Sequence, residues 1–200
     1  MKKFISGILA CLLMLVLTAC AAGNGASADN RAEKADVPKN DTILVVYFSA
    51  TGNTQKVANT IAEQTGGTLF EIRPEQPYTT DDLNYRDKTS RVWSEHHDPN
   101  YRPAYVGDVE NWDQYDTIYI GYPLWWQQAP HVVYSFVEQH NFNGKRVIPF
   151  CTSISSPLGT SAENLAKAAG TGDWQDGVRF NGSVSPSEVT TWVKGIQQHI

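Results

Sequence analysis

The stretch from Ser49 to Thr54 holds the side chains of this chain that are best suited to bind an anion. It reads Ser-Ala-Thr-Gly-Asn-Thr and carries three hydroxyls, one amide and no lysine or arginine. It follows the apolar run 43–48 and precedes a segment with helical periodicity. At a helix start, free backbone N–H groups and the positive end of the helix dipole converge. The stretch therefore predicts a phosphate site built from hydrogen bonds, although an ordinary polar turn has a similar composition.

Two later loops carry groups that suit the rest of such a ligand. The sequence 121–126 is Gly-Tyr-Pro-Leu-Trp-Trp, and two adjacent tryptophans are hard to bury completely in a small domain. We expect at least one indole to offer a flat face to a planar group. The sequence 151–159 supplies hydroxyls and backbone donors for the polar edge of a ring. Together the three loops predict a site for a phosphorylated heteroaromatic cofactor.

Alternating strands and helices must position these loops. Apolar runs predict strands over 43–48, 68–72, 116–121, 145–150 and 178–180. Helical spacing predicts helices over 54–64, 81–96, 131–139, 161–169 and from 186 onward. The last helix has a capping box, with Ser185 as N-cap, Pro186 in the first turn and Glu188 three residues on. The alternation predicts an α/β fold, a doubly wound five-stranded parallel sheet that binds ligands beyond the carboxyl ends of its strands.

The first forty residues predict export and a lipid anchor. Lys2 and Lys3 precede an apolar run, 5–17, that is too short for a normal membrane span. The sequence Leu-Thr-Ala-Cys at 17–20 resembles the lipobox of bacterial lipoproteins. That resemblance implies a signal peptide over 1–19, a lipid on Cys20 and an extracytoplasmic protein anchored to a bacterial membrane. An ordinary cleavable signal or a retained anchor helix is the alternative.

The residues after Cys20 divide into a linker and one domain. Residues 20–40 contain almost no large apolar side chain and predict a flexible linker, which leaves 41–200 as the folded domain. Cys151 is the only cysteine of that domain, so we expect no intrachain disulfide and regard Cys151 as a small buried hydrophobe. The adjacent His96 and His97 predict a solvated helix end rather than a metal site.

The charge balance bears on the partners of the protein. The formal net charge is −5, and between residues 71 and 116 eleven acidic residues face five basic ones. Nucleic-acid binding needs a basic footprint, so we expect no nucleic-acid partner. The acidic band is interpreted as a solvated face, with docking of a basic redox partner as the alternative.

The motifs together resemble the flavodoxin family and, more narrowly, its bacterial subgroup of flavodoxin-like lipoproteins. The resemblance rests on Ser-x-Thr-Gly-Asn-Thr after the first strand and Gly-Tyr-Pro-x-Trp-Trp after the third, and it covers essentially the whole domain. It implies flavin mononucleotide (FMN), bound without a covalent bond on a sheet of order 2-1-3-4-5. By position, the FMN phosphate would be held by Ser49, Thr51, Gly52, Asn53 and Thr54.

The same resemblance assigns the ring end of the site. Pro123, Leu124, Trp125 and Trp126 would border the isoalloxazine, and its pyrimidine side would be lined by Thr152, Ser153, Ser155 and Gly159. Members of the subgroup often carry glycines where this chain has Gln127 and Ile154. Larger side chains there could narrow the slot for the ring.

The resemblance implies a membrane-tethered electron-transfer flavoprotein. Its partner would be a redox protein or a small-molecule electron donor or acceptor. We expect no catalytic residue in the chain itself, because the flavin carries the redox chemistry. His131, close to the tryptophan loop, could influence the charge of the flavin. Two alternatives stay open: an FMN-dependent NAD(P)H/quinone-type oxidoreductase, and a non-redox binding lipoprotein that has lost its flavin.

Overall fold

A computed structural model describes residues 42–198 of the chain. The predicted signal peptide, the lipidation site Cys20 and the linker 20–40 lie outside the described residues. Within them, no helix is both long and apolar enough to cross a membrane.

A parallel sheet forms the centre of the described part. Its order is β2 (Thr68–Glu71), β1 (Ile43–Tyr47), β5 (Thr117–Pro123), β6 (Arg146–Ser153) and then two short strands, β7 (Asp173–Trp174) and β8 (Val178–Asn181). Both short strands pair with β6 in parallel and share the fifth place of the sheet. The predicted order 2-1-3-4-5 is therefore confirmed, with the last strand interrupted. The central strands are buried on both faces, which explains their unbroken apolar sequences.

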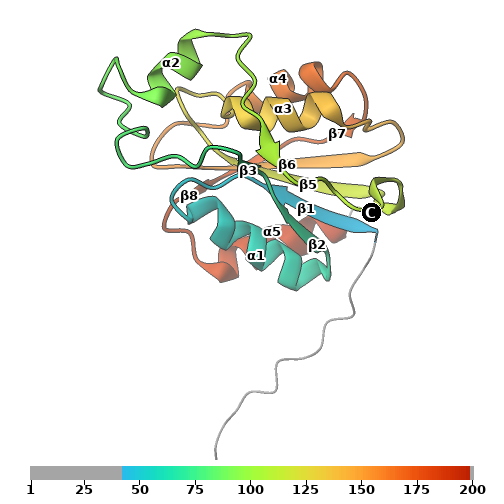
Figure 1. The fold of residues 1–200 in the computed structure, drawn as a ribbon. Helices are drawn as coiled ribbons and strands as arrows, with labels where there is room; N and C mark the ends of the chain where they lie inside the picture. Colours follow the sequence, from blue (N-terminus) through green and yellow to red (C-terminus); the bar gives the residue numbers. More distant parts are fainter. Residues whose placement is uncertain (1–41, 199–200) are drawn as a thin grey trace, which may run out of the picture. The chain divides into compact units, whose positions relative to one another are not determined.

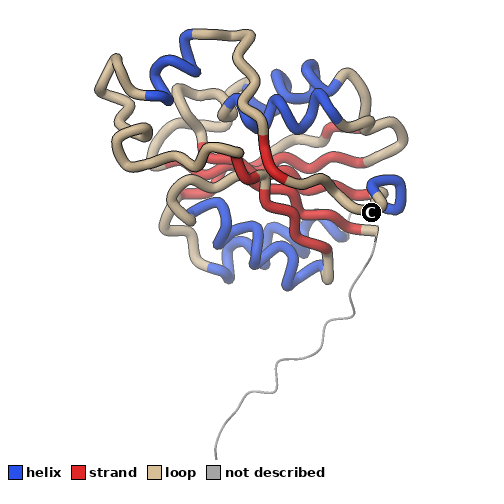
Figure 2. The backbone as a smooth tube through the Cα atoms, viewed as in Figure 1, coloured by secondary structure: helices blue, strands red, loops and turns tan. Residues whose placement is uncertain are grey.

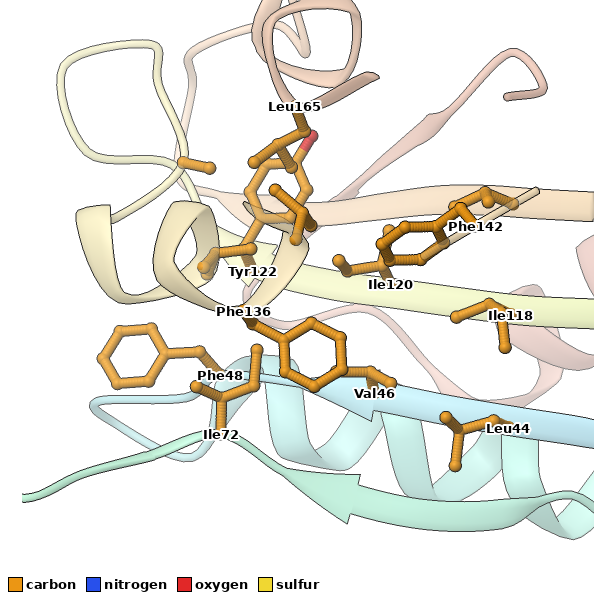
Figure 3. Close-up of a cluster of buried hydrophobic side chains, with 14 of the residues drawn as sticks. Leu44, Val46, Phe48, Ile72, Ile118, Ile120, Tyr122, Phe136, Phe142 and Leu165 are labelled. Atoms are coloured by element: carbon orange, nitrogen blue, oxygen red, sulfur yellow. The ribbon is translucent and has the colours of Figure 1, made fainter. Parts of the chain in front are cut away.

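Helices cover both faces of the sheet (Figure 1). On one side, α1 (Asn53–Thr65) and α5 (Pro186–Gln197) pack together. On the other, α3 (His131–Gln139) packs beside α4 (Ser161–Ala169). The predicted capping box of α5 is present. Each helical layer closes its own core, and Figure 3 shows part of the one that includes Val46, Ile120 and Phe136.

The segment between β2 and β5 is mostly irregular (Figure 2). A short antiparallel pair, β3 (Arg73–Pro74) and β4 (Tyr105–Val106), brings its two ends together, and η1 (Trp112–Gln114) follows. The prediction of a helix over 81–96 is confirmed only for 91–96, because the one α-helix of this segment is α2 (Arg91–His97), and residues 81–90 form turns. Asp82 and Asp87 accept hydrogen bonds from backbone N–H groups at 79 and 89 and so stabilise turns instead.

Two central strands run further than predicted. β5 continues to Pro123 and β6 to Ser153, and the pairing of Pro123 with Thr152 persists to these ends. The close packing between β5 and β6 requires a glycine at position 121, since a Cβ there would lie 2.1 Å from the ring of Phe150. The strand extensions place the starts of the second and third predicted loops next to each other.

Candidate functional site

The three predicted loops meet at the carboxyl end of β1, β5 and β6. The hydroxyl oxygens of Thr54 and Thr152 lie 2.8 Å apart, which joins the first loop to the third. The N–H of Leu124 donates to the carbonyl of Thr152 over 2.9 Å, which joins the second to the third. Both threonines are almost fully buried. The edge of the sheet therefore holds the three loops in fixed register.

The first loop leaves several hydrogen-bonding groups free. No side chain caps α1, whose N-cap residue is Gly52 with a φ of 83°. A left-handed backbone of this kind favours glycine. The Oγ of Ser49 is buried and has no hydrogen-bond partner among the described residues. Ser49 also borders a cavity of about 240 Å³ that lies between it and Tyr78. A helix start without a cap and a buried hydroxyl without a partner are what an anionic group would satisfy.

The other members of the first loop differ in exposure. Thr51 is exposed, Asn53 is half-buried at the start of α1, and Thr54 is committed to Thr152. Thr54 therefore stabilises the loop by a side-chain contact, while Thr51 remains open to solvent.

The second loop is a tight turn that presents both tryptophans. Trp125 and Gln128 exchange two backbone hydrogen bonds of 2.9 and 3.0 Å around the pair Trp126-Gln127. Trp126 and Gln127 have φ values of 49° and 66°. Two consecutive positive φ angles are typical of a type I′ turn, in which glycine is favoured and a bulky residue is strained. The Gln128 side chain anchors the turn by accepting a hydrogen bond from Asn164 of α4, at 2.8 Å.

Rings from other segments contact both tryptophans. Trp125 makes edge-to-face contacts with Phe48 and Tyr78, with centroids 5.6 and 5.3 Å away. Trp126 stacks on His96 of α2 at 4.6 Å and 16° between ring planes. We expected one indole to present its flat face to a planar group, and in the structure the planar group on Trp126 is the imidazole of His96. The segment that carries α2 thus packs on the tryptophan loop.

The buried carboxylate of Glu95 stabilises the segment that carries α2 through its hydrogen bonds. Glu95 is 6% exposed, and its carboxylate accepts hydrogen bonds from Tyr78 at 2.6 Å and from Arg91 at 2.7 Å. The Arg91 guanidinium also lies 4.1 Å from the centre of the Tyr78 ring. Burial and the carboxylate of Glu95 raise the pKa of Tyr78, so its hydroxyl keeps its proton. Sequence analysis missed this group, because the three residues are dispersed over a segment without clear periodicity.

The third loop is anchored from β8. Arg179 donates to the hydroxyl of Ser153 at 2.9 Å and to the carbonyls of Ser153 and Ile154 at 3.0 and 2.7 Å. The Ser153 hydroxyl itself donates to the carbonyl of Ser156. Ser155 and Gly159 are exposed further along the loop. Nothing in the sequence around Arg179 pointed to this role, which depends on β8 lying beside β6.

Cys151 lies at the same sheet edge but is not a reactive thiol. It is fully buried, and burial raises the pKa of its thiol to about 12. Because the thiolate is the nucleophile, such a group is inert near neutral pH. Cys151 is thus a core residue, as expected. Among the described residues, no group of three or more His, Cys, Asp or Glu is arranged to hold a metal ion.

Comparisons with known proteins agree with this geometry. A family model described as flavodoxin matches residues 42–196. A crystal structure of a protein from Bacteroides eggerthii, assigned as a flavoprotein, is 40% identical, with a TM-score of 0.72 and coverage of 79% of this chain and 99% of that one. A second, from Bacteroides uniformis, is 41% identical, with a TM-score of 0.73 and coverage of 78% and 99%.

A more distant structure shares the fold. The flavoprotein of Lactobacillus acidophilus, solved in complex with FMN, is 21% identical, with a TM-score of 0.58 and coverage of 76% of this chain and 99% of that one. No curated protein matches the chain. The match of one family model to most of the chain, together with two structures near 40% identity, shows that the chain belongs to the flavodoxin family.

Proposed function

We propose that this protein binds FMN at the carboxyl edge of its sheet and transfers electrons while tethered to a bacterial membrane by a lipid on Cys20. The observation that carries the FMN assignment is the first loop, where an uncapped helix start and the unpartnered hydroxyl of Ser49 converge. The Lactobacillus acidophilus relative supports it, because that protein was solved with FMN.

The phosphate of FMN fits the donors of the first loop. Ser49 and Thr51 offer hydroxyls, and the first N–H groups of α1, from Asn53 onward, offer backbone donors. Gly52 allows the chain to turn closely around the anion. Thr54 supports these donors through its bond to Thr152. The loop contains no cation, so hydrogen bonds and the dipole of α1 hold the phosphate.

We place the ring of FMN against the second and third loops. The four residues that border it are those of the second loop, Pro123, Leu124, Trp125 and Trp126. Ser155, Gly159 and the backbone beside Thr152 line its polar side, while the hydroxyl of Ser153 is committed to shaping the loop. When bound, FMN supplies the redox chemistry. The protein binds it, orients it between the loops and excludes water from one side.

The FMN assignment is tested by titrating the purified protein with FMN and following the quenching of flavin fluorescence. We expect binding at micromolar FMN. Ser49→Ala should weaken it roughly tenfold, the typical contribution of one hydrogen bond to a charged group. Ser187→Ala, an exposed serine on α5, is the control and should bind as the wild type does. Absence of binding at micromolar FMN would overturn the proposal.

Electron transfer and tethering need separate tests. The FMN-loaded protein, reduced with dithionite, should pass electrons to a one-electron acceptor such as ferricyanide, and failure to do so would exclude a carrier. For the anchor, Cys20→Ser should move the protein from the membrane fraction to the aqueous fraction of the producing bacterium. Membrane association that is unchanged in Cys20→Ser would overturn the lipid tether.

A further inference from the structure

Two imidazoles lie beside the tryptophan loop, and the site described above gives neither of them a part in the redox chemistry. His131 is the first residue of α3, and His96 belongs to α2. Both line a small cavity of about 10 Å³, together with Trp125 and Trp126. Such a volume holds about one water molecule. Two helices distant in sequence thus bring two titratable rings to the indoles that border the proposed flavin ring.

His131 is held in a state that can accept a proton. Its Nδ1 is buried and has no hydrogen-bond partner among the described residues. Burial lowers the pKa of His131, and the nearby Arg102 and His96 lower it further. The N-terminal end of α3 is also the positive end of its dipole, which disfavours a cation at this position. His131 is therefore neutral near pH 7, with one ring nitrogen unsatisfied.

His96 is the second imidazole of the pair. Its ring lies flat on Trp126 at 4.6 Å. Burial lowers the pKa of His96, and the neighbouring His97 lowers it further. Each ring of the pair is thus neutral and next to an indole.

Among the described residues, no carboxylate forms an ion pair with His131 or His96, and Asp98 acts on His131 only from a distance. Glu95 already accepts hydrogen bonds from Tyr78 and Arg91. Arg102 is paired with Glu138 at 2.8 Å. The remaining groups that act on the two imidazoles are His97 at the end of α2, Asp98 directly after it, the backbone at Tyr101 and the ring of Tyr134. If a negative charge arises near the tryptophans, His131 can therefore take up a proton and act as its counter-ion.

We propose that His131, assisted by His96, takes up a proton when FMN bound at this site is reduced. The inference rests on the proposed function. Two electrons come from a redox protein or a chemical reductant, and two protons come from solvent. FMN bound here would take up the two electrons and one proton, at N5, and Nδ1 of His131 takes up the other proton. The imidazolium would then balance the one negative charge left on the ring, and no bond to the protein forms.

This coupling changes the pH dependence of the midpoint potential of the bound flavin. A negative charge nearby favours the protonated imidazole, so the pKa of His131 rises on reduction. At a pH between the pKa of His131 with oxidised FMN and its pKa with reduced FMN, one extra proton is taken up with the two electrons. A tenfold change in proton concentration then shifts a two-electron potential by about 30 mV more than in a protein without this group.

The test is a potentiometric titration of the FMN-loaded protein from about pH 5.5 to 8.5. The wild type should have the steeper slope over part of this range, His131→Asn should lose the extra slope, and His96→Asn should lose part of it. His140→Gln, a histidine that pairs with Asp108 and does not line this cavity, is the control and should keep the slope of the wild type. Equal slopes for wild type and His131→Asn would overturn the proposal.

A second measurement serves if His131→Asn does not fold. The imidazole of His131 is titrated by NMR in the wild-type protein, with FMN oxidised and then reduced by dithionite. A pKa that rises by about one unit or more supports the inference, and an unchanged pKa overturns it. Absence of FMN binding in the fluorescence titration defeats the proposed function instead, so the two failures are distinguishable.

Discussion

The hydroxyls of Thr54 and Thr152 meet at 2.8 Å in the buried edge of the sheet, 98 residues apart in the chain. This contact ties the start of α1 to the end of β6. It fixes the distance between the loop assigned to the phosphate and the loop assigned to the ring. Since each hydroxyl is buried, each depends on the other as its hydrogen-bond partner.

A double-mutant cycle tests this contact. Thr54→Val and Thr152→Val should each lower the free energy of unfolding by about 1–3 kcal/mol, because each leaves a buried hydroxyl unsatisfied. The double variant should cost less than the sum, since no unpaired hydroxyl remains. Urea unfolding measures all three. Thr191→Val, exposed on α5, is the control, and strictly additive losses would contradict the coupling.

Arg179 should control the third loop. Arg179→Gln removes the donors to Ser153 and Ile154, so we expect the dissociation constant for FMN to rise roughly tenfold. Arg179→Lys keeps the charge but not the planar fork and should recover only part of the affinity. Arg86→Gln, in an exposed turn, is the control. Full affinity in Arg179→Gln would show that the loop does not depend on β8.

The strained turn of the second loop, around Trp126 and Gln127, predicts a substitution that raises the free energy of unfolding. Gln127 has a φ of 66°, so Gln127→Gly should relieve left-handed strain and raise the free energy of unfolding by up to ~1 kcal/mol. Gln76→Gly, in an exposed loop where φ is not positive, should be neutral or slightly destabilising. Thermal unfolding of both variants makes the comparison, and a loss of stability in Gln127→Gly would refute the strain.

The segment carrying α2 should loosen when Tyr78 loses its hydroxyl. Tyr78→Phe removes a donor to the buried carboxylate of Glu95, so we expect a loss of about 1–3 kcal/mol of stability. Local opening should appear as faster hydrogen exchange over α2. Tyr85→Phe, on a ring that is 57% exposed, is the matched control. Unchanged exchange in Tyr78→Phe would mean that other contacts hold the segment.

The capping box of α5 predicts a pH dependence of stability. Hydrogen bonds from the backbone and side chain of Ser185 lower the pKa of Glu188 below its usual value. The stabilisation is therefore fully present above the unfolded-state pKa, near 4.5, and is lost as the pH falls through the lower folded-state pKa. The difference in unfolding free energy between wild type and Glu188→Gln should be constant from pH 7 to about 5 and shrink below that. In a Ser185→Ala background the pH-dependent part should shrink but persist, because the backbone N–H at position 185 still donates to the Glu188 carboxylate.

Much of the fold and of the candidate site could be predicted from local sequence. The unbroken apolar runs marked the central strands because those strands are buried on both faces, and the spacing of α3, α4 and α5 matched their apolar faces. The first loop and the tryptophan loop were found because each is one continuous stretch. The predicted helix over 81–96 was too long at its start, because the side chains of Asp82 and Asp87 bind the backbone of turns there.

The sequence alone determined the five main strands of the sheet and their order, the helices on its faces, the family and the three loops that meet at one edge of the sheet. Only the tertiary structure decided which side chains remain available there. The partners of Thr54, of Ser153 and of Trp126 come from β6, β8 and α2, which lie far away along the chain. Local periodicity reports which face of an element is buried, but it carries no information about which distant group satisfies a given hydroxyl or stacks on a given ring. That choice depends on packing across the whole domain.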